Sequence, residues 1–249
     1  MKAILNDTYR PYPAPTARWI MRQTWHDLCF MHWPVPAESL RPHIPASLEI
    51  DTFEGQAWIA VVPFRMSDIH PRGLFAVPSL SAFPELNVRT YVIRDGRPGV
   101  WFFSLDAGNR LAVEIARKWF MLPYFHARMA LAALPSHGIH YTSQRIHPNA
   151  PTAGLIAQYR PTQTPFEATP GTLEYFLTAR YCLYTADGAG RVYRGEIDHV
   201  PWPLQRAEAE IERNTLCDWI PVQLPATQPL LHFARRLDVV VWPLQTLEP

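Results

Sequence analysis

The chain has 249 residues, of which 48% are hydrophobic and 18% are charged, and its formal net charge is +1. This composition is typical of a globular protein that is long enough to bury a substantial core. It offers no basic surplus for nucleic acid or an anionic membrane, and no apolar run reaches the roughly 18 residues of a membrane span. We therefore expect neither a nucleic-acid partner nor a membrane partner.

The contents of proline, cysteine and lysine are informative. The 26 prolines outnumber the 11 glycines, which disfavours long helices and favours short strands joined by rigid turns. Cys29, Cys182 and Cys217 are far apart and odd in number, as expected for reduced thiols in a cytoplasmic protein. Lysine occurs only at Lys2 and Lys118, so arginine supplies nearly all of the positive charge.

The predicted elements begin with an extended N-terminal arm over residues 1–18, and one domain follows over residues 19–249. Apolar and aromatic residues predict strands over 25–33 and 56–64, with a short helix over 36–44 between them. Small residues and proline predict a loop over 67–84.

Alternation of side chains predicts a strand over 86–93, paired through a hairpin turn at 95–99 with a return strand over 100–105. A helix is predicted over 109–122, where Asn109 can cap the first turn. Its apolar stripe consists of Leu111, Ile115, Trp119 and Leu122.

The second half of the chain is predicted to be strand-rich. Strands are expected near 140–146, 155–160, 173–184, 191–200 and 230–242, and a charged helix is expected over 204–214. No linker or repeat divides the chain. The predicted fold class is therefore α+β, mainly antiparallel β, with a closed or nearly closed sheet and two or three outer helices.

The strand that contains Glu85 carries the strongest signal for a site. Glu85, Asn87, Arg89 and Tyr91 fall on one face, opposite an apolar face. That polar face either meets solvent or lines a cavity, and the aromatic return strand with Trp101 and Phe103 favours the cavity. There Arg89 could hold a carboxylate, and burial could raise the pKa of Glu85 so that it moves protons.

Other candidates are weaker. Arg117 lies on a helix face that an ordinary set of surface salt bridges would also explain, and His32 and His126 are either hydrogen-bonding groups of a pocket or satisfied core residues. The histidine spacings do not match a zinc site, and no phosphate-binding loop or nucleophile elbow is present. We therefore expect no metal and no cofactor.

Several stretches resemble the YqjF-like family (domain of unknown function 2071), which is grouped with the acetoacetate-decarboxylase-like superfamily. They are 32–36 (HWPVP), 50–58 (IDTFEGQAW), 83–92 (FPELNVRTYV), 99–107 (GVWFFSLDA), 122–124 (LPY) and 199–204 (HVPWPL). The resemblance implies a β-cone or barrel with a central pocket and flanking helices, and it is compatible with a homo-oligomer.

At the position of the imine-forming lysine, the chain differs from acetoacetate decarboxylase. Acetoacetate decarboxylase places its imine-forming lysine after a helix in a Phe-Pro-Lys-Lys context, whereas this chain has Leu122-Pro123-Tyr124-Phe125. Tyr124 stands where the imine would form, and arginine cannot replace lysine in that role. Glu85 matches the acidic residue of the decarboxylase pocket. Chemistry through an imine is therefore not expected unless Lys118 turns inward.

Two hypotheses follow for the function. One is a lyase-type enzyme acting on a small keto or hydroxy acid, with Glu85, Arg89, Tyr124 and His126 catalytic. Its substrate-binding residues would be Asn87, Tyr91, His32, Trp101, Phe103 and Arg117. The other is a binding protein for a small organic anion or an apolar ligand, which would use the same residues without catalysis.

Overall fold

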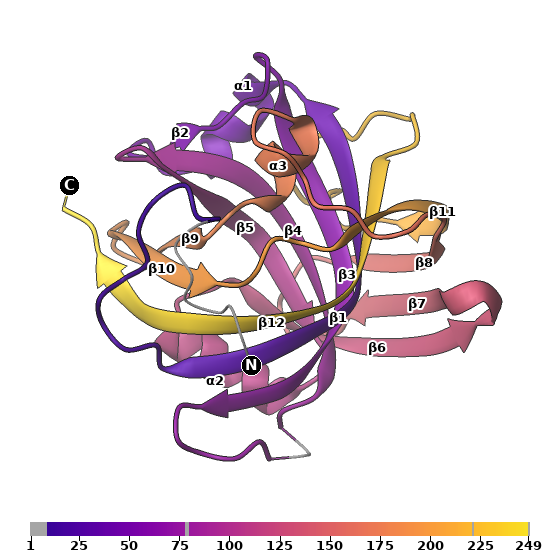
Figure 1. Cartoon of the computed structure of the whole chain (residues 1–249), viewed down its shortest axis with the longest axis horizontal. Coiled ribbons are helices and arrows are strands. Elements are labelled where there is room, and N and C mark those ends of the chain that lie inside the picture. Colours follow the sequence, from indigo (N-terminus) through magenta and orange to yellow (C-terminus); the bar gives the residue numbers. More distant parts are fainter. Residues whose placement is uncertain (1–8, 78–79, 221, 249) are drawn as a thin grey trace.

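A computed structural model describes residues 9–77, 80–220 and 222–248 of the chain (Figure 1). Its helices are α1 (Ala37–Leu40), α2 (Arg110–Trp119) and α3 (Leu173–Thr178), with short 3-10 turns at Arg41–His43 and Pro135–His137. Its strands are β1 (Met21–Val35), β2 (Glu49–Ile50), β3 (Ala57–Pro71), β4 (Phe83–Arg94), β5 (Arg97–Ala107), β6 (Tyr124–Leu134), β7 (Gly138–Arg145), β8 (Gly154–Pro161), β9 (Cys182–Ala186), β10 (Val192–Asp198), β11 (Leu204–Asn214) and β12 (Leu230–Thr246). The fold is therefore mostly β-sheet with few helices, as expected.

Hydrogen bonds join the strands into one sheet in the order β10-β9-β5-β6-β7-β8-β11-β12-β1-β3-β4-β2. Two further pairings, β4 with β5 and β10 with β12, link strands that are distant in this order. The strands β1, β3, β4, β5, β9, β10 and β12 consequently form a ring of hydrogen-bonded neighbours. The pairings are antiparallel except those of β5 with β6 and with β9.

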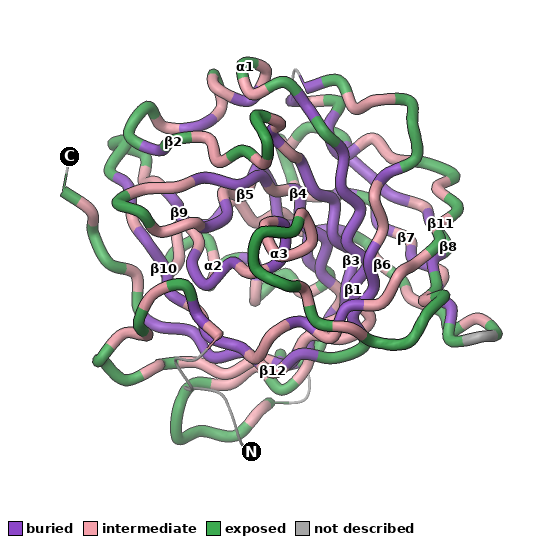
Figure 2. The backbone as a smooth tube through the Cα atoms, turned by 45° about the horizontal axis from the view of Figure 1, so that its top comes forward, coloured by how far each residue is buried: buried purple, intermediate pink, exposed green. Residues whose placement is uncertain are grey.

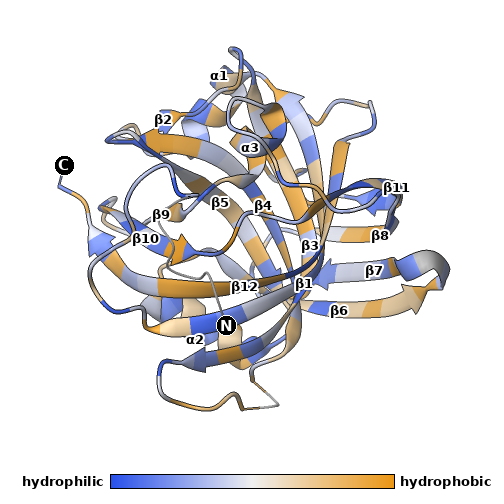
Figure 3. Ribbon diagram, viewed as in Figure 1, coloured by the Kyte–Doolittle hydropathy of each residue, from blue (hydrophilic) through white to orange (hydrophobic). Residues whose placement is uncertain are grey.

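The strands β6, β7, β8 and β11 extend the sheet away from that ring. Figure 1 shows the hairpin of β6 and β7 projecting from the body of the molecule, beside β8 and β11. β11 then pairs with β12 at Leu204–Arg206, which connects the extension to the ring. Figure 3 shows that hydrophobic residues run along the long strands and are interrupted by hydrophilic ones.

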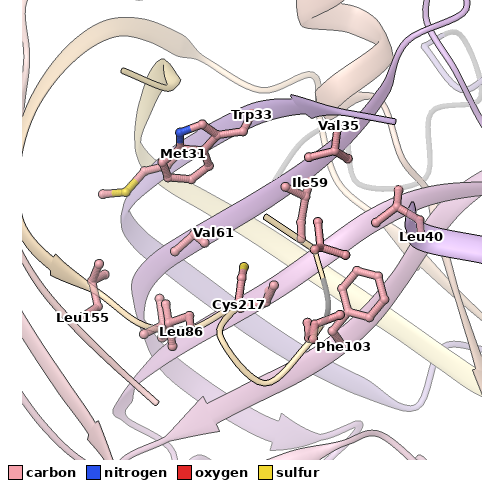
Figure 4. Packing of buried hydrophobic residues seen from close by; sticks show 14 of the residues in the cluster. Met31, Trp33, Val35, Leu40, Ile59, Val61, Leu86, Phe103, Leu155 and Cys217 are labelled. Carbon is pink, nitrogen blue, oxygen red and sulfur yellow. The ribbon is translucent and has the colours of Figure 1, made fainter. Parts of the chain in front are cut away.

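Two buried apolar clusters lie on opposite faces of β1, β3 and β4. In Figure 4 Met31 and Trp33 pack with Ile59, Val61 and Leu86. The other cluster contains Phe30, Val62 and Phe83. Figure 2 shows the same strands as the most continuously buried part of the chain. These strands are therefore held on both faces, which fixes the register of β4 and the direction of its polar side chains.

Most predicted elements of the first half are present. Helix α2 begins after Asn109, whose side chain accepts hydrogen bonds from the backbone N–H groups of Leu111 and Ala112 at 3.1 Å, so the predicted cap is confirmed. The predicted hairpin joins β4 to β5. The loop predicted over 67–84 is shorter than expected, because β3 continues to Pro71 and β4 begins at Phe83.

Two predictions for the second half are wrong. Residues 204–214 form strand β11, because Ala207, Ala209 and Ile211 pack against the core while the alternate glutamates are exposed. Residues 173–178 form helix α3, whose first turn is capped by the Thr172 hydroxyl. Strand β6 was not predicted as an element.

The arm predicted over residues 1–18 lies partly outside the described residues, and its described part, 9–18, forms no helix or strand. Arg10 is buried there and forms ion pairs with Glu196 at 3.1 Å and with Asp198 at 2.8 Å. This segment is therefore fastened to β10. Within the described ranges, no helix is long and apolar enough to cross a membrane.

Candidate functional site

A cavity of about 580 Å³ lies against the polar face of β4, between β1, β3, β5 and helix α2. Most of its lining is apolar. Its polar lining residues are Gln23, Glu85, Asn87, Arg89, Tyr124, Thr178, Arg180 and His199. The polar face predicted for β4 thus borders a cavity, while Leu86 and Val88 point into the core on the other face.

Glu85 is buried in this lining. The Tyr124 hydroxyl donates a hydrogen bond of 2.8 Å to Glu85 Oε2, and Tyr141 donates one of 2.8 Å to the Glu85 carbonyl oxygen. Burial raises the pKa of Glu85 to about 8; the Tyr124 hydrogen bond opposes this rise and the charge of Asp106 adds to it. A carboxyl group with such a pKa can accept or donate a proton near neutral pH.

A buried ion pair lies next to Glu85. Both carboxylate oxygens of Asp106 accept hydrogen bonds from Arg145, at 2.7 and 2.8 Å, and both side chains are almost fully buried. The Arg145 guanidinium also lies 4.1 Å from the centre of the Phe125 ring. This pair supports the wall that carries Glu85 and was not predicted from the sequence.

Arg89 lies further along β4. Its guanidinium carbon is 5.4 Å from the centre of the Phe30 ring and 5.9 Å from that of Tyr91. Among the described residues no carboxylate lies within ion-pair distance of it, whereas the other cavity arginine, Arg180, is paired with Asp51 at 2.5 Å. Arg89 is therefore the guanidinium best placed to bind an anionic ligand in the cavity.

His32 and Tyr91 pack beside Arg89 and do not line the cavity. Both are fully buried, and His32 Nε2 is 2.6 Å from the Tyr91 hydroxyl. Burial, together with the nearby charge of Arg89, lowers the pKa of His32 well below its ordinary value. The imidazole is therefore neutral, and the pair supports Arg89 from the side rather than facing a ligand.

The remaining predicted residues lie elsewhere. Trp101, Phe103 and Arg117 line a second cavity of about 550 Å³, on the other side of Phe102 and Leu122. His126 lines neither cavity, and its backbone N–H donates to His147 Nδ1 at 3.2 Å. The structure brings together Glu85, Asn87, Arg89 and Tyr124, but not these four.

Arg180 and His199 line the cavity and were not predicted as site residues. His199 Nδ1 donates to the carbonyl oxygen of Val200 at 2.7 Å, and burial lowers the pKa of His199 to about 4. The stretch 199–204 carried a signal for His199, since it is one of those that resemble the family. Nothing local to Arg180 marked it.

Lys118 is exposed on helix α2 and is not part of the cavity lining, and Lys2 lies outside the described residues. Among the residues that the structure describes, no group of three or more His, Cys, Asp or Glu side chains could hold a metal ion. All three cysteines are free and buried.

Comparison with known proteins identifies the family. A family model described as "Uncharacterized conserved protein", for the domain of unknown function DUF2071, matches residues 22–238. The chain belongs to the DUF2071 family. The uncharacterized protein YqjF of Bacillus subtilis (strain 168) is 48% identical over 231 residues, which is 93% of this chain and 94% of that protein. The resemblance found in the sequence is thus confirmed.

Solved structures similar to this DUF2071 protein share its fold at low sequence identity. The enduracididine biosynthesis enzyme MppR complexed with pyruvate has a TM-score of 0.64 at 9% identity, with 96% of this chain and 93% of MppR covered. Acetoacetate decarboxylase from Legionella pneumophila has a TM-score of 0.63 at 11% identity, with 97% and 94% covered. The fold of this DUF2071 protein is therefore acetoacetate-decarboxylase-like.

Proposed function

We propose that this protein is a lyase-type enzyme that transfers a proton next to the carbonyl group of a keto or hydroxy acid. The observation that carries the proposal is the buried Glu85 carboxyl, which has a pKa of about 8 and is hydrogen-bonded to Tyr124 in the wall of a cavity. Arg89 would hold the carboxylate of the substrate. The ring of paired strands would enclose the reacting end of the substrate and keep water away from it.

The proposed step moves one proton and one electron pair. The ionised Glu85 removes a proton from the carbon next to the carbonyl, and the electrons of that bond form the enolate, whose oxygen becomes negative. When the following carbon carries a hydroxyl group, these electrons return to expel it, and the proton on Glu85 passes to it, so that water leaves and a carbon–carbon double bond remains. Once Glu85 is protonated, its carboxyl group no longer depends on the hydrogen bond from the Tyr124 hydroxyl. That hydroxyl can then donate to the new oxyanion. The structural neighbour MppR, which has been solved with pyruvate, supports a keto acid as the class of substrate.

A screen in two parts tests the proposal. Thermal shifts with keto acids, hydroxy acids and lipids identify ligands, because a ligand that binds only the folded state raises the melting temperature. Deuterium exchange at the carbon next to the carbonyl, followed by NMR in D₂O, then reports proton transfer. The proposal predicts exchange with the wild-type protein and exchange slower by roughly 10²- to 10⁴-fold with Glu85→Gln, and a ligand that binds the wild type without any exchange overturns it.

Binding without catalysis is the second candidate function. It is favoured by the mostly apolar cavity lining and by Arg89, which could bind an organic anion without any chemistry. The same screen separates the two functions, because a binding protein shows the thermal shift but neither exchange nor turnover.

Reduction with borohydride in the presence of a keto acid tests the absence of an imine. We expect no covalent adduct by mass spectrometry, because the only lysine in the described residues, Lys118, is exposed outside the cavity. A positive control is an imine-forming decarboxylase that is trapped under the same conditions. A stable adduct on Lys118 would contradict the proposed chemistry.

Tyr124→Phe should move the pH profile of the reaction. The phenol donates to Glu85 and thereby lowers the pKa of that carboxyl, so its removal raises this pKa above about 8. If Glu85 acts as a base, the rise of kcat/KM with pH will occur at higher pH in the variant. Tyr193→Phe is a matched control, because the Tyr193 hydroxyl donates to Asp187 at 3.0 Å outside the cavity. An unmoved profile in Tyr124→Phe would remove Glu85 from the role of base.

A further inference from the structure

Helix α2 leaves part of its apolar face uncovered at one open side of the cavity, which we call its mouth. The stripe of Leu111, Ile115 and Trp119 is 51%, 41% and 74% exposed, whereas Val113 provides the buried contact. Ile115 and Trp119 also line the cavity, and Leu111 does not. A continuous apolar surface therefore leads from the exposed side of α2 into the cavity and reaches Glu85.

The size of the cavity exceeds the needs of a short acid. A volume of about 580 Å³ lies within the roughly 300–1,000 Å³ of cavities that bury drug-sized ligands. A three- or four-carbon acid would leave most of it empty. The unfilled part is lined by side chains such as Phe64, Phe83 and Phe120, which would make few van der Waals contacts with a small polar ligand.

Glu85 and Arg89 lie on the same strand of the cavity wall, β4. Arg89 is four positions after Glu85, so their Cα atoms lie about 13 Å apart along β4. No ion pair joins these two side chains, both of which belong to the described part of the chain. A ligand can lie between the two groups, with its carboxylate at Arg89 and its reacting carbon toward Glu85. Phe83, at the start of β4, belongs to the apolar lining.

We propose that the substrate is an amphiphilic oxo acid whose carboxylate lies at Arg89 and whose alkyl chain runs past Glu85 to the mouth at Ile115 and Trp119. This inference rests on the proposed function for the carbonyl end and adds the chemical class of the rest of the molecule. The alkyl chain would cover the apolar stripe of α2 that the protein itself leaves exposed. Pyruvate-sized acids would fill only the polar end.

The test is a chain-length series of 2-oxo acids from three to ten carbons, measured by isothermal titration calorimetry below the micelle concentration of each acid. The proposal predicts that Kd falls with each added methylene, by up to about fourfold, until the chain reaches the mouth. A Kd that does not change between three and ten carbons overturns it. 2-Octanone and octylamine are controls for unspecific adsorption, and binding equal to that of the oxo acid would also overturn the proposal.

Two variants of α2 provide a matched comparison. Trp119→Ser and Leu111→Ser both remove an exposed apolar side chain, but only Trp119 lines the cavity. We expect Trp119→Ser to raise the Kd of the longest acids by about tenfold and to leave the Kd of the three-carbon acid unchanged. Leu111→Ser should change neither Kd. Equal effects of the two variants contradict the proposed path.

The readouts separate this inference from the proposed function. Tight binding of long acids without deuterium exchange would overturn proton transfer and leave the amphiphilic ligand intact. Exchange of short and long acids at equal kcat/KM, with equal Kd, would overturn the amphiphilic substrate and leave proton transfer intact.

Discussion

Replacing Glu85 by glutamine is expected to lower the rate of proton transfer by roughly 10²- to 10⁴-fold and, at the same time, to stabilise the folded protein at pH 7 to 8. The activity is lost because an amide cannot exchange the proton. The stability rises because the wild-type carboxyl has a pKa of about 8 in the fold, against an ordinary value of 4.5. A carboxyl group buried in this environment is costly for the fold.

The direction in which stability changes with pH follows from the number of protons that each state binds. Between pH 4.5 and 8 the folded protein holds a proton on Glu85 that the unfolded chain releases, so the free energy of unfolding falls as pH rises through this window. For these pKa values the loss reaches about 3 kcal/mol at pH 7. Glu85→Gln removes this dependence, so the two proteins should differ most at pH 8 and least near pH 4.5.

Urea unfolding of both proteins across that pH range measures the difference. Glu210→Gln is the matched control, because Glu210 is exposed on β11 and is not part of the cavity lining, and we expect the stability of this variant to depend on pH as that of the wild type does. Parallel curves for Glu85→Gln and the wild type would show that Glu85 does not carry a raised pKa in the fold.

Asp106→Asn should be the most destabilising conservative change near the site. It leaves the Arg145 guanidinium buried without its counter-charge, which typically costs about 3–5 kcal/mol. The expected result is a lower urea midpoint with an unchanged slope. Because the charge of Asp106 also raises the pKa of Glu85, the variant should shift the pH profile of any activity to lower pH.

A surface ion pair provides the control for this prediction. Glu208 and Arg160 lie at 2.5 Å, but their side chains are 56% and 49% exposed, against 1% for Asp106 and Arg145. Glu208→Gln should cost no more than about 1 kcal/mol. The double variant Asp106→Leu/Arg145→Met should be more stable than Asp106→Asn, because it leaves no unpaired charge. Equal losses for Asp106→Asn and Glu208→Gln would argue against a structural role for the buried pair.

The sequence predicted the fold class and most strands because alternation is a local property. In β4 the polar residues alternate with the apolar ones, and this pattern survives in the structure as a cavity face and a core face. β11 has the same alternation in Ala207, Ala209 and Ile211, but alanine and glutamate favour helices, so the segment also fits a helix. Antiparallel pairing with β8 stabilises the segment as a strand.

The site was only partly predictable, because its other members come from distant segments. Glu85 and Arg89 follow from one strand, and Tyr124 follows from the family resemblance. The contact between Asp106 and Arg145, and the position of Arg180 in the cavity, depend on how β5, β7 and the segment after α3 meet. Of the predicted stripe, Leu111, Ile115 and Trp119 lie on α2, but Leu122 lies beyond its end at Trp119. The exposure of these three side chains depends on the tertiary structure and could not be inferred from helical period.

The partners of β1 determine when this protein can finish folding during synthesis. β1 pairs on one edge with β3 and on the other with β12, where Met21 faces Val241. Arg10 likewise meets its carboxylates only in β10. While the ribosome is still making the middle of the chain, one edge of β1 has no strand to pair with and remains open to other chains. Its late closure predicts slow folding and a dependence on chaperones that shield this edge until residues 230–246 emerge.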